Sequence, residues 1–74
     1  MNPPIPQVSG REVVRALGRV GFEQVGQRGS HVKLRNQAGR VVIVPMHREF
    51  KVGTLRSIIR QSGVIVDDFI GLLS

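Results

Sequence analysis

Apolar residues recur every three or four positions near the start of the 74-residue chain, as they do along one face of a helix. The residues on this predicted stripe are Val13, Val14, Leu17 and Val20. Ser9 and Glu12 form a capping-box pattern ahead of it, in which each side chain accepts a hydrogen bond from the other residue's backbone amide. Gly21 is placed to stop the helix, with Phe22 packing back on the stripe. We therefore expect a helix from about Ser9 to Val20.

The pattern then changes to the alternation of a strand. Val32 and Leu34 are separated and flanked by polar residues, so in an extended chain they lie on one face and the polar residues on the other. A hairpin loop at 36–39 leads from this strand into 40–44, the most β-prone run in the chain, which Pro45 ends.

A shorter and weaker strand is expected ahead of these two, at 22–27. Val25 would be its apolar anchor, and Gly26 marks a bulge or a close backbone approach. The three strands together predict an antiparallel meander.

A second helix follows, with Thr54 as its expected N-cap and Gly63 as its stop. Its apolar face consists of Leu55, Ile58 and Ile59. Arg56 and Arg60 share the opposite side of this helix. A last short helix, capped by Asp67, would complete the chain.

The predicted order is α-β-β-β-α with a C-terminal extension. Two amphipathic helices on one side of a three-stranded antiparallel sheet make a two-layer α+β sandwich, and the other face of the sheet stays open. The proline-rich residues 1–8 predict a flexible N-terminal arm, and residues 9–74 a single domain.

Charge adds the first indication of function. Eleven Lys and Arg residues against five Asp and Glu give a net charge of +6, which favours a polyanionic partner such as RNA or an acidic protein surface. With no cysteine and only two histidines, we expect no metal site, and we expect no small-molecule cofactor. No apolar run approaches the roughly 20 residues of a membrane helix, and the start of the chain has no signal-peptide pattern. We therefore expect a cytoplasmic protein that does not bind membranes.

The alternation of the second strand places His31, Lys33 and Arg35 together on the open face of the sheet. Lys and Arg there could hold RNA phosphates. An imidazole gives or takes a proton near neutral pH, so His31 could remove the proton of a 2′-OH beside a scissile phosphate. Gly29 and Ser30, just before it, could bring backbone amides or the Ser30 hydroxyl to a phosphate oxygen.

Each of these features also has a plainer explanation. A single surface histidine and a row of cations are more often only solvated, and Ser30 is more often a turn residue than a ligand. His47, in the loop after Pro45, is either simply exposed or a second acid–base group that protonates the leaving 5′-oxygen. Arg56 and Arg60 could add phosphate contacts or form an ordinary solvated helix face.

A set of short motifs appears in one order along the chain. They are SGREVVRAL from Ser9, Gly21-Phe22, GSH at 29–31, VVIVP at 41–45, His47, and GTLRSIIRQSG at 53–63. In these motifs the chain resembles the HicA family of mRNA interferase toxins, from Ser9 to about Phe69. It differs from many members in having Val32, rather than a second histidine, directly after His31. By alternation Val32 should face the core.

The resemblance implies a double-stranded-RNA-binding-like fold, cleavage of mRNA, and neutralisation by a HicB-type antitoxin that covers the active site. It also implies that the histidine of the GSH motif, here His31, is catalytic. The expected protein is then a metal-independent endoribonuclease acting on single-stranded RNA, which is bound by Gly29, Ser30, Lys33 and Arg35. Two other functions use the same residues: a noncatalytic RNA-binding module, and a protein-interaction domain whose basic face meets an acidic partner.

Overall fold

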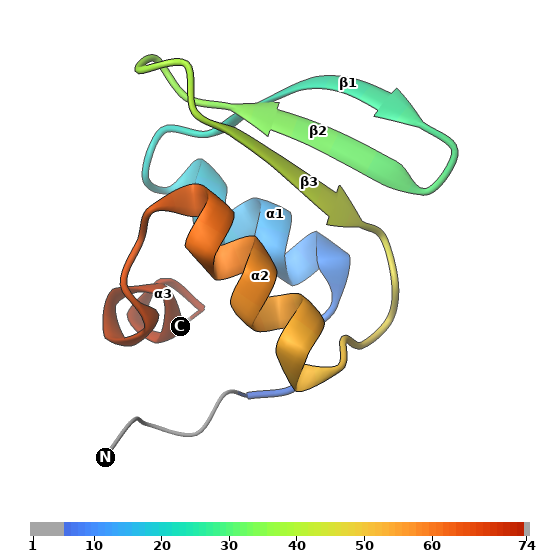
Figure 1. Cartoon of the computed structure of the whole chain (residues 1–74), viewed down its shortest axis with the longest axis vertical. Helices are drawn as coiled ribbons and strands as arrows, with labels where there is room; N and C mark the ends of the chain where they lie inside the picture. Colours follow the sequence, from blue (N-terminus) through green and yellow to red (C-terminus); the bar gives the residue numbers. More distant parts are fainter. Residues whose placement is uncertain (1–5, 74) are drawn as a thin grey trace.

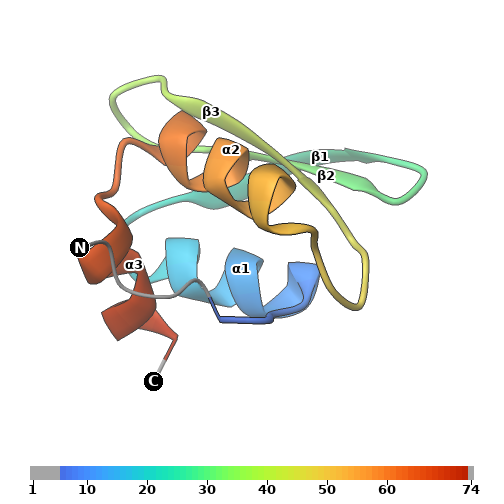
Figure 2. The same ribbon diagram turned by 60° about the horizontal axis from the view of Figure 1, so that its bottom comes forward.

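A three-stranded sheet packed on helices forms the domain, and the computed structural model describes residues 6–73 of it. The elements are α1 (Gly10–Gly18), β1 (Glu23–Arg28), β2 (His31–Arg35), β3 (Val41–Pro45), α2 (Val52–Ser62) and α3 (Val66–Leu72). The sheet is antiparallel with the order β1-β2-β3. Helices α1 and α2 cover one of its faces, and α3 packs beside α1 (Figures 1 and 2). The predicted two-layer α+β sandwich is confirmed.

Helix α1 begins with the predicted capping box. The Ser9 amide donates to Glu12 Oε1 at 2.9 Å, and the Glu12 amide donates to Ser9 Oγ at 3.2 Å. The bond from the Ser9 amide favours the charged carboxylate and, together with the Ser9 side chain, holds the pKa of Glu12 below its usual range. The nearby charge of Arg15 adds to the effect.

The end of α1 also follows the sequence signals. The Phe22 amide donates to the Leu17 carbonyl at 3.1 Å around Gly21, whose φ is 94°, as in a Schellman motif. The regular helix stops at Gly18 rather than Val20, because the next amides bond three residues back as in a 3₁₀ turn. Val20 therefore leaves the predicted apolar stripe and is 44% exposed.

Strand β2 lies at the centre of the sheet and alternates between exposed and buried residues. Val32 and Leu34 point into the core, where they lie opposite Val44 and Val42 of β3. The largest side chains that the helices and connecting segments add to this core are Leu17, Phe22, Phe50, Leu55, Ile58, Ile59 and Phe69. The predicted direction of Val32 is confirmed.

Strand β1 is less well covered than the sequence pattern predicts. It has no buried residue. The prediction that Val25 anchors the strand in the core is wrong, since its side chain is 46% exposed. The pairing with β2 shifts between Gln24 and Gly26, so Val25 is the extra residue of a bulge. The bulge signalled by Gly26 is confirmed.

Two predicted helix caps are wrong. Helix α2 already begins at Val52, where the Leu55 amide donates to the Lys51 carbonyl, so Thr54 lies inside the helix. Likewise α3 begins at Val66, and Asp67 lies in its first turn, where a negative charge still suits the helix dipole. In contrast, the predicted stop of α2 is confirmed, because Gly63 adopts a left-handed conformation with φ 74°.

The predicted N-terminal arm, residues 1–8, lies mainly outside the described residues. Within its described part, Val8 is 5% exposed and packs in the core. None of the helices in residues 6–73 is long and apolar enough to cross a membrane.

A close backbone approach joins the start of α1 to one end of the sheet. The Gly10 amide donates to the His47 carbonyl at 2.8 Å, and the Met46 amide donates to the Ser30 carbonyl at 2.6 Å. A Cβ atom on Gly10 would lie only 2.6 Å from the Pro45 carbonyl oxygen and 2.8 Å from the Met46 Cα. Glycine at this position therefore lets α1 contact the exit of β3 directly, and Met46 of that exit bonds in turn to the β1–β2 turn.

We predict that Gly10→Ala lowers the free energy of unfolding by about 1–3 kcal/mol, because the backbone must move to admit the methyl group. Gly18→Ala in the same helix is the control. Nothing lies within 4 Å of its added Cβ, so it should be neutral or slightly stabilising. Urea unfolding of both variants checks this, and equal stabilities would contradict the close approach.

We predict that Glu12 stabilises the fold only where its carboxylate is charged. Its pKa is lowered in the folded protein. Its contribution is thus complete above the ordinary glutamate value near ~4.3 and disappears as the pH falls through the lower folded value. The difference in Tm between wild type and Glu12→Gln, measured from about pH 7 to about pH 3, should shrink below about pH 4. A difference that is independent of pH would mean that the charge plays no part in the cap.

Candidate functional site

The uncovered face of the sheet carries the three residues that the alternation of β2 selects. His31, Lys33 and Arg35 are all exposed there. The strand register gives each of them one neighbour on β1 and one on β3. The three rows are Arg28–His31–Pro45, Gly26–Lys33–Ile43 and Glu23–Arg35–Val41. The face is thus basic along its centre and partly apolar along β3.

Arg28 is a cation of this face that the sequence pattern alone did not bring out. It is the last residue of β1 and lies directly opposite His31. Opposite residues of antiparallel strands have Cβ atoms only about 4.5–5.5 Å apart. The signal was present in the sequence, because the residues that flank a two-residue turn must pair with each other.

A two-residue turn, Gly29-Ser30, positions His31 at the start of β2. Gly29 has φ 57°. Ser30, the second residue of the turn, does not have a positive φ, since in the described residues only glycines do. A positive φ at the first turn position alone is the pattern of a type II′ turn, which has glycine there. Gln27 Nε2 donates to the Gly29 carbonyl at 3.0 Å, and the Ser30 carbonyl accepts the Met46 amide. Both carbonyls of the turn are therefore held in place.

The surroundings of His31 leave its imidazole free for a substrate. The ring is exposed, and no residue between 6 and 73 forms a hydrogen bond with it. Beyond it, Lys33 lies opposite Gly26, which has no side chain and faces open space. A substrate could therefore reach both side chains from the open face.

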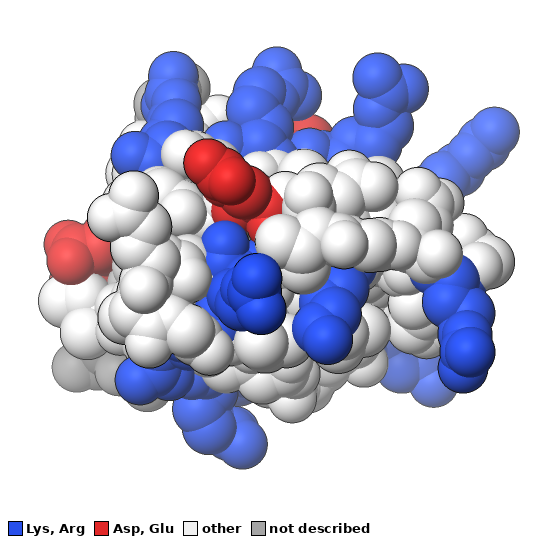
Figure 3. All heavy atoms as spheres, turned by 90° about the horizontal axis from the view of Figure 1, so that it is seen from above, with Lys and Arg blue, Asp and Glu red and all other residues white. Residues whose placement is uncertain are grey.

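Apolar and acidic groups also contribute to this face. Val41 and Ile43 are 38% and 39% exposed, and Glu23 lies opposite Arg35. Figure 3 views the molecule from the side of the sheet and shows Lys and Arg both along its edges and near its centre, with an acidic group and uncharged surface among them. Such a mixture offers cations to phosphates and apolar side chains to bases or to a protein partner.

His47 lies at the same end of the sheet as His31, but its ring has another neighbour. The preceding residues connect the two places, since Pro45 lies opposite His31 and Met46 bonds to the turn. The His47 ring lies 6.0 Å from the ring of Phe50, centroid to centroid. Within residues 6–73, no group of three or more His, Cys, Asp or Glu side chains could hold a metal ion.

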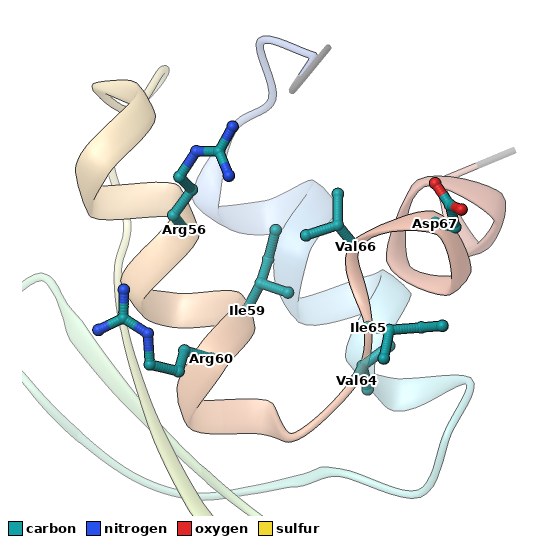
Figure 4. A pocket seen from close by; sticks show the side chains of 7 residues that line it. All are labelled: Arg56, Ile59, Arg60, Val64, Ile65, Val66 and Asp67. Carbon is teal, nitrogen blue, oxygen red and sulfur yellow. The ribbon is translucent and has the colours of Figure 1, made fainter. Parts of the chain in front are cut away.

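Arg56 and Arg60 do not join the open face. They line a separate groove of about 460 Å³ between α2 and the segment that leads into α3 (Figure 4). Its apolar lining consists of Ile59, Val64, Ile65 and Val66. All residues of this groove come from the helical layer, so the structure separates these two arginines from His31.

The small α+β domain with its open basic sheet face has a counterpart among toxin–antitoxin proteins. A chain in the solved "Toxin-Antitoxin complex from Streptococcus pneumoniae" is 31% identical to this one and superimposes with a TM-score of 0.67. The match covers 82% of this chain and 100% of that chain. No curated protein matches the sequence. The family model of the HicA toxin of bacterial toxin–antitoxin systems matches residues 10–64, and the chain therefore belongs to the HicA toxin family.

We predict that Gly29→Ala destabilises the protein by about 1–2 kcal/mol, because an L-residue is strained at positive φ. Gly26→Ala in the same hairpin is the control. An added Cβ meets open space at both positions, but only Gly29 has a positive φ. Urea unfolding should show a loss of stability for Gly29→Ala alone, and equal effects would mean that the turn conformation is not the cause.

Proposed function

We propose that the protein is the toxin of a toxin–antitoxin pair and acts in the cytoplasm as a metal-independent endoribonuclease on mRNA. The observation that carries this proposal is the position of His31. It is an exposed imidazole without a protein partner, between Arg28 and Pro45, on the open sheet face of a HicA family member.

In this proposal His31 is the general base. It takes the proton of a ribose 2′-OH, and the oxygen attacks the adjacent phosphorus. The bond from phosphorus to the 5′-oxygen then breaks, leaving a 2′,3′-cyclic phosphate on one product and a 5′-hydroxyl on the other. Arg28 and Lys33 stabilise the negative charge that develops on the phosphate. The 5′-oxygen takes up a proton as it leaves, and His47 is the candidate donor, since its backbone lies at the His31 end of the sheet.

Lys33 and Arg35 are the proposed contacts to neighbouring phosphates, with Gly29 and Ser30 close to the scissile one. Their surroundings differ. Lys33 has uncharged neighbours, Gly26 and Ile43, whereas Arg35 lies opposite the carboxylate of Glu23. A nearby negative charge weakens the attraction for phosphate, so Lys33 is expected to contribute more to RNA binding than Arg35 does.

The proposed protein partner is a HicB-type antitoxin that covers the open face. A net charge of +6 suits an acidic partner surface, and charge complementarity of this kind speeds and orients association. The exposed Val41 and Ile43 beside the cationic row would be buried in such a contact.

Incubation of the purified protein with single-stranded RNA in excess EDTA tests the proposal. Wild type should cleave, and His31→Ala should reduce activity by about 10²–10⁴-fold, the usual contribution of a general base. RNA with a single 2′-deoxy nucleotide at the cleavage site should resist, because it lacks the nucleophile. DNA should not be cut.

The control is Arg60→Gln, which removes a charge from the separate helical groove and should leave cleavage unchanged. Equal cleavage by wild type and His31→Ala would contradict the assigned role. If wild type and His31→Ala both bind RNA but cleave neither free RNA nor mRNA under translation, the protein is a noncatalytic RNA-binding module.

A further inference from the structure

Two arginines of α1 have no role in the site described so far. Arg11 and Arg15 are four residues apart, so they lie on the same side of the helix, and both are exposed. Together with Val14 and Met46 they line a groove of about 390 Å³, which we name the α1 groove.

The α1 groove connects directly to the His31 end of the sheet through Met46. The preceding residue, Pro45, lies opposite His31 on the open face, and the Met46 amide bonds to the Ser30 carbonyl. Met46 itself turns toward the helical layer, since its Sδ would lie 3.1 Å from a Cβ placed on Gly10. The groove thus begins one residue from the strand position opposite His31, around the end of the sheet.

The start of α1 is fixed at this place. The amide of Gly10, the residue before Arg11, donates to the His47 carbonyl at 2.8 Å. Backbone hydrogen bonds therefore connect the start of the helix that carries both arginines to the loop after β3, and that loop to the β1–β2 turn. A bound chain that passes His31 would meet them at a defined position.

The lining has the chemistry to bind one nucleotide. Guanidinium groups form paired hydrogen bonds with phosphate oxygens. Val14 and Met46 are half-buried and offer apolar contact to a ribose or base. The neighbouring acidic residue, Glu12, accepts the Ser9 amide at the helix start. Its charge also interacts with that of Arg15, so Arg11 is expected to be the stronger phosphate contact of the two.

We propose that the α1 groove binds the nucleotide next to the scissile phosphate of single-stranded RNA. The bound strand then turns around the end of the sheet, from His31 to α1. This inference rests on the proposed ribonuclease function. It also supplies a reason for selecting single strands, because a stiff duplex does not make so sharp a turn at small energetic cost.

The test compares Arg11→Gln/Arg15→Gln with Arg56→Gln/Arg60→Gln. Each pair removes two charges four residues apart on a helix, but the second pair lines the other groove (Figure 4). Binding is measured with a single-stranded RNA made uncleavable by 2′-O-methyl groups, over a range of salt concentrations. Cleavage of ordinary RNA gives KM and kcat, and thermal melting confirms that both double variants are folded.

The double variant Arg11→Gln/Arg15→Gln should bind RNA more weakly, and its plot of log affinity against log salt should be shallower. The slope should change by about 0.7 for each phosphate that the protein no longer neutralises. KM should rise several-fold with little change in kcat, because these arginines hold the substrate without touching the reacting atoms. The second pair should behave like wild type.

The outcomes separate the two proposals. If Arg11→Gln/Arg15→Gln has the affinity, salt slope and KM of wild type, the α1 groove is not a subsite, whereas the ribonuclease proposal is unaffected. Equal weakening in both pairs would also overturn it, because it would show a general charge effect. If wild type binds RNA but cleaves none, the ribonuclease proposal fails, and the binding data still decide whether the groove contacts RNA.

Discussion

The close approach of α1 to the exit of β3 holds the two layers of the domain in their relative position. It is possible because Gly10 has no side chain at a point where a Cβ would lie 2.6 Å from a carbonyl oxygen of the strand exit. The same place contains two hydrogen bonds between distant segments, Gly10 to His47 and Met46 to Ser30. These bonds join α1 to the loop after β3, and that loop to the turn before His31. A small domain without disulfides needs such contacts, because its core alone is thin.

The two faces of the sheet differ in burial. Its inner face is buried by α1 and α2, with Val32 and Leu34 of β2 at the centre. Within residues 6–73 no helix covers its outer face, so the polar residues of the same strand remain accessible (Figures 1 and 2). Because side chains alternate along a strand, a one-residue shift in register would move the buried side chains of β2 to the solvent face. The stability of the core therefore also fixes the position of His31.

Local signals explain where the sequence analysis was right and where it was wrong. The capping box at Ser9 and the glycine stop at Gly21 act between residues close in the chain, so both could be predicted. The expected cap at Thr54 was wrong because the chain becomes helical right after the buried Phe50, and that burial depends on the tertiary core. The prediction that Val25 is buried was wrong for a related reason. The helices pack mainly on β3 and leave β1 without buried residues.

The local sequence was enough to place His31, Lys33 and Arg35 on one face, since the two-residue period of a strand is a property of the backbone. It was also enough for the α+β order of the elements. The packed fold was needed to show that the Arg11 side of α1 lies beside Met46, and that the His47 ring lies near the ring of Phe50. These arrangements depend on how the helical layer docks on the sheet. Such docking is set by packing and hydrogen bonds between residues far apart in the chain, which no short stretch of sequence encodes.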